Sequence, residues 1–319
     1  MLALRIDGGK LAVNDIPKPV AGAEAVVRVV ISGICNTDLE IVRGYAGFSG
    51  TIGHEFVGVA ESVPGRAELE GKRVVGEINA GCGTCFRCVA GDPRHCPERT
   101  VLGIVGRDGA HAEYLSLPAE NLAAIPDGVS DIEAVFTEPL AAACGILEQV
   151  EIGSDTRVAV IGDGKLGLLC AAAMAKVADN VTAIGKHDSK LEIAEEFGAA
   201  PMHRDDIRPD LLRSFDVVVE ASGSEAGFAT AVDIVRPRGK IVLKSTFHGT
   251  PRWDAARVVV DEITIVGSRC GRFAPAIELL ARGGIDVTKL ISGEFALADG
   301  VAAMEAASKA GVLKVLLRP

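Results

Sequence analysis

The sequence predicts an α/β fold with two domains, one rich in β-strands and one built on a doubly wound parallel sheet. In the N-terminal part, β-branched runs separated by proline and glycine predict short strands at residues 25–32, 56–63 and 73–76. From residue 158 onward, apolar strand-like runs alternate with helical runs, which is typical of a parallel sheet. The chain also has 319 residues, more than one hydrophobic core usually holds.

Composition narrows the class of protein. Hydrophobic residues make up 48% of the chain and charged residues 24%, as in globular proteins, and the net charge of -10 argues against a nucleic-acid surface. The first ten residues have no signal-peptide design, and no apolar run reaches membrane-spanning length. We therefore expect a cytoplasmic protein without nucleic-acid or membrane partners. Its eight cysteines are then reduced thiols or metal ligands rather than disulfides.

Candidate metal ligands lie beside two of the expected N-terminal strands. Cys35 follows the first strand and precedes Asn-Thr-Asp, which suits the start of a helix. His54 and Glu55 lie at the loop before the second strand. A thiolate and an imidazole brought to one place suit zinc, which takes sulfur, nitrogen and oxygen ligands. A cysteine and a histidine this far apart are ordinarily unrelated, so the interpretation depends on what surrounds them.

A second candidate metal site is contained in one loop, GCGTCFRCVAGDPRHC at residues 81–96. Its cysteines are spaced by two, two and seven residues and are Cys82, Cys85, Cys88 and Cys96. Such gaps let one loop place four thiolates around a tetrahedral ion, and four sulfurs leave no open position, so we expect structural zinc. Two alternatives stay open, an iron–sulfur cluster and unliganded thiols, although the ferredoxin pattern closes after three residues rather than seven. His95 is expected to be a bystander.

The motif around which the chain is organised is VAVIGDGKLG at residues 158–167. A strand-like run enters three glycines, and an apolar helical run follows. The first glycine permits a tight turn, the second leaves room for a pyrophosphate, and the third lets the helix pack on the strand. Free N–H groups at the helix start then face the phosphates. This order predicts a Rossmann dinucleotide site whose expected contacts are Gly162, Gly164, Lys165, Leu166 and Gly167.

The rest of the chain continues the alternation. Further strands are expected at residues 180–184, 216–220, 240–243, 256–260 and 263–266, and helices at residues 190–197, 226–235 and 273–282. The last two of these strands are apolar and lie near the end of the sheet, where an edge invites pairing with another chain. Residues 301–319 predict a helix and then a strand.

Together these residues resemble the zinc-containing medium-chain dehydrogenases, the alcohol and polyol dehydrogenase family. The matching stretches are GICNTD at 33–38, GHEFVG at 53–58, the cysteine loop at 82–96, EPL at 138–140, GDGKLG at 162–167 and GVLKVLL at 311–317. The resemblance covers almost the whole chain. It implies a GroES-like catalytic domain over residues 1–140 with the zinc lobe at 81–97, a Rossmann domain over 141–267, and a segment, 268–319, that returns to the catalytic domain.

The resemblance also implies roles for individual residues. Cys35 and His54 would ligate a catalytic zinc, with Glu55 beside the metal and Glu138 in the remaining position. Zinc lowers the pKa of a bound hydroxyl, Thr37 would take its proton, and hydride would pass to a nicotinamide. The resemblance thus implies a zinc-dependent alcohol or polyol oxidoreductase with two zinc ions per chain.

Two further residues near this site are compared with the family: Asp38 fits its pattern, and Glu40 departs from it. Asp38 would orient a histidine ligand, as carboxylates around zinc sites commonly do. Many alcohol dehydrogenases have a histidine five residues after the zinc cysteine that relays the proton outward, and here that position is Glu40. The path of the proton beyond Thr37 is therefore left open.

The preference between NAD and NADP is predicted from the residues after the second Rossmann strand. An NAD site has an acidic residue about 20 positions past the glycine turn, bonded to the ribose 2′-OH. Aligning the following helix with the family puts this position at Gly185, so the acid is missing. Lys186 and His187 would supply charge to a 2′-phosphate, which favours NADP(H) over NAD(H). The rival interpretation uses Asp188 as the ribose partner. Ser222 is a further expected cofactor contact.

Two alternative functions stay open, and a third is disfavoured. The chain could be an NAD-dependent polyol or amino-alcohol dehydrogenase of the same family, or a non-catalytic zinc- or dinucleotide-binding protein. A zinc-free reductase of the superfamily would lack Cys35 and His54, which are present here. Because the family commonly dimerises through the edge of the Rossmann sheet, we expect a homodimer or homotetramer, with a small alcohol or carbonyl compound as the substrate.

Overall fold

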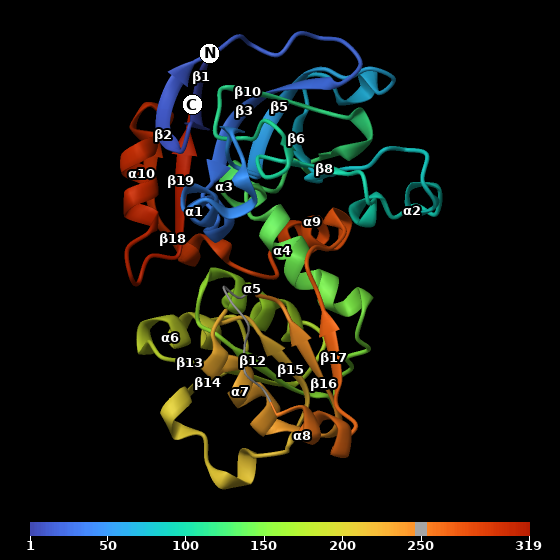
Figure 1. Cartoon of the computed structure of the whole chain (residues 1–319), viewed down its shortest axis with the longest axis vertical. Coiled ribbons are helices and arrows are strands. Elements are labelled where there is room, and N and C mark those ends of the chain that lie inside the picture. The colour runs from blue at the N-terminus through green and yellow to red at the C-terminus, as the bar shows by residue number, and fades with distance from the viewer. Residues whose placement is uncertain (246–253) are drawn as a thin grey trace. The chain divides into compact units, whose positions relative to one another are not determined.

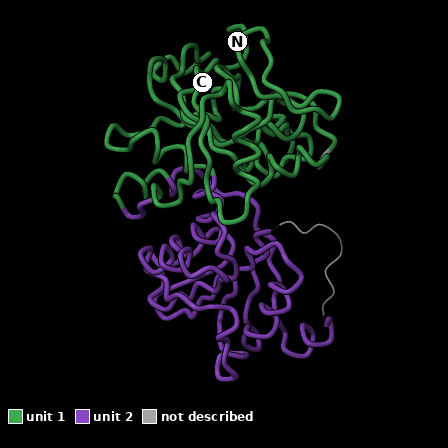
Figure 2. Tube along the Cα trace, turned by 90° about the vertical axis from the view of Figure 1, so that its left-hand side faces the viewer, with its two compact units in different colours: residues 1–138, 277–283, 287–319 green, residues 139–276, 284–286 purple. Residues whose placement is uncertain are grey.

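The computed structural model describes residues 1–245 and 254–319, which form two compact units (Figures 1 and 2). Unit 1 contains residues 1–138, 277–283 and 287–319, and unit 2 contains residues 139–276 and 284–286. Residues 268–276, expected in the returning C-terminal segment, thus group with unit 2. Within the described residues, no helix is both long enough and apolar enough to span a membrane.

Unit 1 is built mainly from β-strands. They are β1 (Leu2–Asp7), β2 (Lys10–Asp15), β3 (Ala25–Gly33), β4 (Gly50–Thr51), β5 (Glu55–Ser62), β6 (Arg73–Gly76), β7 (Asn79–Ala80), β8 (Thr100–Leu102), β9 (Gly106–Arg107), β10 (Tyr114–Leu117), β11 (Leu122–Ala124), β18 (Ile291–Ala296) and β19 (Lys314–Arg318). Its helices are α1 (Asn36–Val42), α2 (Phe86–Val89), α3 (Asp131–Ala134) and α10 (Gly300–Ala307). Two helices cross the boundary between the units, α4 (Thr137–Cys144) and α9 (Phe273–Ala281).

The main sheet of unit 1 has the strand order β11-β6-β5-β3-β19-β18, with β10 also paired to β3. The C-terminal strand β19 therefore lies between β3 and β18 and pairs antiparallel with β3. One apolar cluster of this unit includes Val27, Phe56 and Leu117, and another includes Leu4, Ile34 and Leu317. The second cluster joins the first strand, the last strand and α10, so the chain termini contribute to one core.

Unit 2 is a parallel sheet with helices on its faces (Figure 1). Its strands are β12 (Arg157–Ile161), β13 (Asn180–Gly185), β14 (Ala200–His203), β15 (Phe215–Glu220), β16 (Val235–Leu243) and β17 (Thr264–Gly267), and its helices are α5 (Lys165–Met174), α6 (Asp188–Glu196), α7 (Glu225–Ile234) and α8 (Ala255–Val260). The strand order is β14-β13-β12-β15-β16-β17, and every neighbouring pair is parallel. This confirms the α/β class with a doubly wound sheet.

One expected strand is a helix. The β-branched run 256–260 forms most of α8, because the Asp254 side chain caps the helix by accepting a hydrogen bond from the Ala256 N–H at 3.0 Å. The cap supplies a helix start that strand propensity alone does not reveal. The adjacent run at 263–266 does form a strand, β17, at the edge of the sheet.

Candidate active site

Cys35 is held at the junction between β3 and α1. It is the N-cap residue of α1, and its backbone N–H donates to the Asp38 carboxylate at 2.8 Å. This hydrogen bond between the Cys35 backbone and the Asp38 side chain fixes the backbone from which the Cys35 thiol projects. The Thr37 hydroxyl lies two residues further on, 3.7 Å from the Cys35 sulfur. The predicted helix start at Asn-Thr-Asp is thus present and positions both side chains.

Strand pairing brings the other two candidate ligands to Cys35. In the register of β3 with β5, Gly33 lies opposite Glu55. A Cβ at Gly33 would lie 2.5 Å from the Glu55 carboxylate, so this position requires glycine. Ligand atoms of Cys35, His54 and Glu55 all lie within 4.8 Å of one another. Residues far apart in sequence thereby form one cluster of sulfur, nitrogen and oxygen donors.

Asp38 lies between two histidines. Its two oxygens are 3.3 Å from Nδ1 of His54 and 3.5 Å from Nε2 of His111, and all three side chains are buried. Burial alone would raise the pKa of the Asp38 carboxyl, but the two histidines hold that pKa well below its ordinary value. His111 is in turn 2.9 Å from the Ser32 hydroxyl through Nδ1. With Nδ1 of His54 facing Asp38, its Nε2 is the nitrogen free to ligate a metal.

Lys314 of β19 pairs with Glu55, and both side chains are 1% exposed. Its ammonium also lies 3.5 Å from the Ile34 carbonyl and 5.6 Å from the centre of the Phe136 ring. Only the Oε2 oxygen of Glu55 contacts Lys314, and Oε1 has no hydrogen-bond partner among the described residues. A buried carboxylate oxygen without a donor fits a position facing a cation.

These observations test whether the residues fit zinc. The donor set of thiolate, imidazole and carboxylate is one that zinc takes, the donors converge, and Oε1 of Glu55 has no hydrogen-bond partner among the described residues. The residues therefore fit a catalytic zinc. Glu138 lies in the first turn of α4, outside this set of three. Burial, together with the negative charges of Glu55 and Glu77, raises the pKa of Glu138 to about 7.

The cysteine loop fits a second zinc. The sulfurs of Cys82, Cys85, Cys88 and Cys96 lie within 4.8 Å of one another, as corners of a tetrahedral site do. Backbone N–H groups of Cys82 and Cys85 donate to the sulfurs of Cys96 and Cys82 at 3.4 Å. Hydrogen bonds, chiefly from Thr84, lower the pKa of the Cys82 thiol to about 6. These donors favour the thiolate form that zinc binds.

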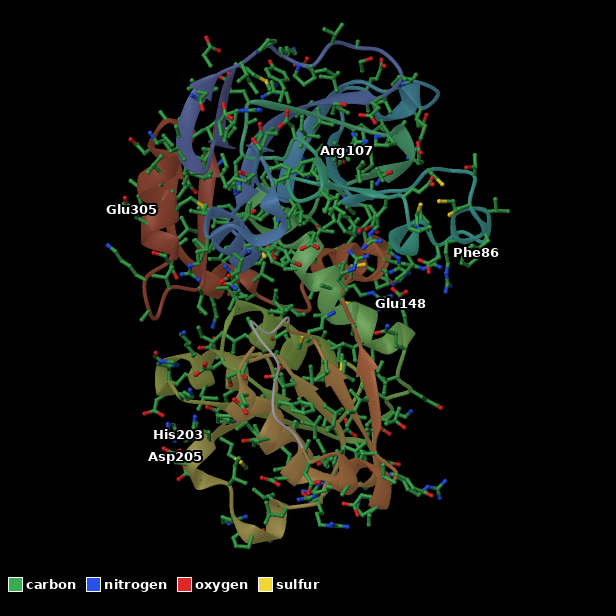
Figure 3. The ribbon with its side chains drawn as sticks, viewed as in Figure 1. Phe86, Arg107, Glu148, His203, Asp205 and Glu305 are labelled. Atoms are coloured by element: carbon green, nitrogen blue, oxygen red, sulfur yellow. The ribbon has the colours of Figure 1, made fainter. Side chains whose placement is uncertain are left out.

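His95 is not part of the group of four sulfurs and instead contacts Asp92 at 2.8 Å, in line with its expected role as a bystander. Figure 3 labels Phe86 on this lobe, beside sulfur atoms drawn in yellow. The Phe86 side chain is exposed and lies on α2, the short helix between Cys85 and Ala90.

The glycine motif of unit 2 has the geometry that was predicted for it. Gly162 has a φ of +118°, and a Cβ there would lie 2.8 Å from the Ala221 backbone. A Cβ at Gly167 would lie 1.9 Å from the Gly162 carbonyl oxygen, so the helix can approach the strand only without one. Gly164 is the N-cap of α5, which starts with Lys165 and Leu166, and it faces open space. The structure therefore offers an uncovered helix start for phosphates.

The remaining expected cofactor residues lie at the ends of β13 and β15. Gly185 ends β13, and the exposed Lys186 and His187 follow it. The Asp163 carboxylate, from the glycine motif, accepts hydrogen bonds from both of their backbone N–H groups. Ser222 follows β15, and its hydroxyl donates to the buried Glu220 at 2.5 Å.

Comparison with known proteins decides the family. The family model of the alcohol dehydrogenase GroES-like domain matches residues 21–127, and that of the zinc-binding dehydrogenases matches residues 166–282. A sorbitol dehydrogenase of Halalkalibacterium halodurans is 30% identical, over 98% of this chain and 96% of its own. The chain belongs to the zinc-containing alcohol and polyol dehydrogenases. This dehydrogenase therefore acts with zinc and a nicotinamide cofactor.

Two solved structures resemble the whole dehydrogenase. A zinc-binding dehydrogenase of Sinorhizobium meliloti 1021, bound to NADP, has a TM-score of 0.91 at 27% identity, with 100% of this chain and 99% of that chain covered. The alcohol dehydrogenase rspB of Escherichia coli CFT073, complexed with NADH, has a TM-score of 0.90 at 28% identity with the same coverage. One relative holds NADP and the other NADH, so the likeness leaves the choice between the two cofactors open.

Sequence reasoning missed three residues of the dehydrogenase site. Lys314 was recognised only as part of a strand, and His111 and Asp163 were given no role. Each acts through a long-range contact, with Glu55, Asp38 and the end of β13 respectively. The one indication in the sequence was the presence of a lysine within the apolar run VLKVLL, since a lysine in a buried strand requires an acidic partner.

Proposed function

We propose that the dehydrogenase oxidises a small alcohol or polyol, or reduces the matching carbonyl compound, at Cys35, His54 and Glu55, with NADP(H) as its preferred cofactor. The observation that carries the site assignment is the convergence of these three donors next to the Thr37 hydroxyl. When bound, zinc supplies a Lewis acid that lowers the pKa of a substrate hydroxyl.

The chain's own residues have distinct tasks in this proposal. Thr37 accepts the substrate proton through its hydroxyl. Asp38 holds His54 with Nε2 toward the metal, and Lys314 holds Glu55 through one oxygen while the other remains available. Glu138 takes the remaining ligand position, directly or through water. Glu40, which is paired with Arg43 at 2.8 Å, stands where many alcohol dehydrogenases have a relay histidine, so this proposal ends the proton path at Thr37.

Changing Cys35 or His54 to Ala tests the site. Turnover should be lost while cofactor binding is retained, because the glycine motif belongs to the other unit. Metal analysis should fall from two zinc ions per chain to one, with the cysteine loop still loaded. Turnover near the wild-type value in a variant that lacks this zinc would contradict the assignment.

The preference for NADP(H) is supported by the end of β13. Gly185 offers no carboxylate to a ribose 2′-OH, and Lys186 is exposed beside it. Lys186 thus has the charge and the freedom to reach a 2′-phosphate. Steady-state kinetics with both cofactors tests this proposal. A higher kcat/KM with NAD than with NADP would contradict it, as would an unchanged KM for NADP in Lys186→Ala.

The substrate class is proposed from the relatives. The names of two relatives indicate hydroxyl-bearing substrates. One is the sorbitol dehydrogenase, and the other is an L-threonine 3-dehydrogenase of Streptomyces coelicolor, which is 32% identical over 95% of this chain. An NAD-dependent polyol or amino-alcohol dehydrogenase is therefore the second candidate. A screen of alcohols, polyols, amino alcohols and aldehydes against both cofactors separates the two.

We also propose that the chain assembles as a homodimer or homotetramer. The strand β17 ends the sheet of unit 2, so its outer main-chain groups have no strand partner among the described residues. The neighbouring helix α8 exposes Val259 and Val260 by 74% and 79%. A second copy of the chain that covers this edge would bury both features.

A further inference from the structure

The end of β13 forms a small cradle of hydrogen-bond donors directed at a single oxygen atom. The backbone N–H groups of Lys186 and His187 lie 2.7 and 2.8 Å from Oδ2 of Asp163, and Nδ1 of His187 lies 2.8 Å from the same oxygen. Successive backbone N–H groups that converge in this way bind anions. The His187 ring adds a third donor, so the cradle is already arranged for a negative group.

Asp163 reaches this cradle from between the first two glycines of the dinucleotide motif. Its side chain is 13% exposed. Burial acts to raise the pKa of its carboxyl, but the hydrogen bonds from residues 186 and 187 hold that pKa below its ordinary value. Asp163 is therefore an anion in the folded protein, held at a fixed position.

The same carboxylate fills the space of the acid that is absent from β13. A Cβ built on Gly185 would lie 2.7 Å from Cβ of Asp163 and 2.8 Å from its Oδ2. A side chain at residue 185 and the present position of Asp163 therefore exclude each other. The acidic residue that an NAD site places at the end of this strand is replaced, in space, by one from the glycine loop.

We propose that Asp163 is a specificity-determining residue for the adenosine ribose of the cofactor. It offers a carboxylate to a ribose 2′-OH, and it opposes a 2′-phosphate both by its charge and by holding the three donors that the phosphate would use. Lys186 attracts the phosphate and Asp163 repels it, so the preference between the two cofactors is a balance between these residues. This inference rests on the proposed function, because it assumes that the chain binds a nicotinamide cofactor at the end of β13.

The test is a binding measurement on the full chain that requires no turnover. Titration calorimetry compares 2′,5′-ADP, which carries the 2′-phosphate, with 5′-ADP, which lacks it. In Asp163→Asn the side chain keeps its shape and an accepting oxygen but loses its charge. We expect the affinity for 2′,5′-ADP relative to 5′-ADP to rise about tenfold or more, as removal of one close like charge predicts. The ratio of kcat/KM for NADP over NAD should rise in parallel.

Asp188→Asn is the matched control. Asp188 is an exposed acid in the first turn of α6, close in sequence to the cradle, and it is the rival candidate for the ribose partner. We expect its substitution to leave the ratio of the two affinities nearly unchanged. An unchanged ratio in Asp163→Asn, or an equal change in Asp188→Asn, would overturn the inference.

A second variant is included in case Asp163→Asn fails to fold. Asp163→Ser retains a hydroxyl that can accept a hydrogen bond from one N–H, and melting curves show which of the two variants is folded. In each variant that folds, the affinity for 2′,5′-ADP relative to 5′-ADP must rise for the inference to stand. The wild-type ratio alone tests the proposed NADP(H) preference, whereas the change on substitution tests the role of Asp163, so the two can fail separately.

Discussion

Lys314 and Glu55 are 259 residues apart in the chain and form a buried ion pair within unit 1. The pair joins the C-terminal strand to the strand that carries a proposed zinc ligand. Burying two charges is costly unless each is matched, and here the lysine is matched by Glu55, the Ile34 carbonyl and the Phe136 ring. The arrangement fixes one oxygen of Glu55 and leaves the other for the metal.

Loss of Lys314 should destabilise the protein strongly. Lys314→Met leaves Glu55 buried without its cation, and removal of one partner from such a pair typically costs about 3–5 kcal/mol of unfolding free energy. Arg318→Met, in the same strand, breaks an exposed pair with Glu294 and should cost less than about 1 kcal/mol. Denaturant unfolding of both variants checks this, and equal losses would show that burial of the Lys314 pair carries no special weight.

Asp38 should control how tightly the catalytic site holds zinc. In Asp38→Asn the charge that orients His54 is lost, and removal of such a partner commonly lowers metal affinity about 10–100-fold. Competition with a chromophoric chelator measures the affinity of each zinc separately. The zinc of the cysteine loop should be retained. An unchanged affinity at the catalytic site would argue that strand pairing alone positions His54.

The cysteine loop should contribute to folding rather than to chemistry. Changing Cys82, Cys85, Cys88 or Cys96 to Ser should remove one zinc per chain and lower the melting temperature, because a closed site couples metal binding to folding. His95→Ala, in the same loop, should keep both zinc ions. A cysteine variant with full zinc and unchanged melting would refute the structural site.

Thr37 should be essential for proton transfer, and its methyl group should not. Thr37→Val keeps the shape of the side chain but removes the hydroxyl beside Cys35, so kcat should fall roughly 100-fold or more. Thr37→Ser restores the hydroxyl and should restore most of the activity. Both variants should keep two zinc ions, which separates a chemical role from a structural one. A Val variant with nearly normal kcat would place the proton acceptor elsewhere.

The edge of the unit 2 sheet should carry the subunit contact. Light scattering at micromolar concentration should report a dimer or tetramer, and Val260→Lys should shift the distribution toward the monomer by placing a charge on the covered face. Val20→Lys, at an apolar residue of unit 1 that is 88% exposed, should have no such effect. A monomeric wild-type protein, or equal behaviour of the two variants, would contradict the proposal.

What the sequence predicted well is local. The cysteine loop places four nearby sulfurs around one point. The glycine motif contains its own turn, its own helix start and the close approach of that helix to the strand. The spacing of residues within each stretch therefore predicts its geometry. Five of the six strands of unit 2 were equally accessible, because each contains a continuous apolar run, whereas β14, with the sequence APMH, has no such run and was not predicted. The exception, 256–260, became a helix since the Asp254 cap outweighed strand propensity.

What the sequence did not predict depends on pairing between distant segments. The contact of Glu55 with Lys314 follows from the pairing of β3 with β5 and β19. The contact of Asp38 with His111 joins α1 to the loop before β10. No single stretch of sequence encodes either contact. Asp163 was visible as a member of the glycine motif, but the contacts that give it a role require β12 and β13 to lie side by side. Family resemblance supplied the zinc ligands, because their positions in sequence alone do not bring them together.

The placement of β19 between β3 and β18 has a consequence for biosynthesis. Synthesis runs from the N-terminus, so every residue of unit 2 is joined to the chain before residue 314, whereas Ser32 and Gly33 of β3 lack their β19 partners until that strand emerges. Until then Glu55 lacks its cation, and the cluster around Cys35 lacks one wall. We therefore expect the dinucleotide-binding unit to be able to fold first, and the metal centre of unit 1 to be completed only when the C-terminal strand adds Lys314.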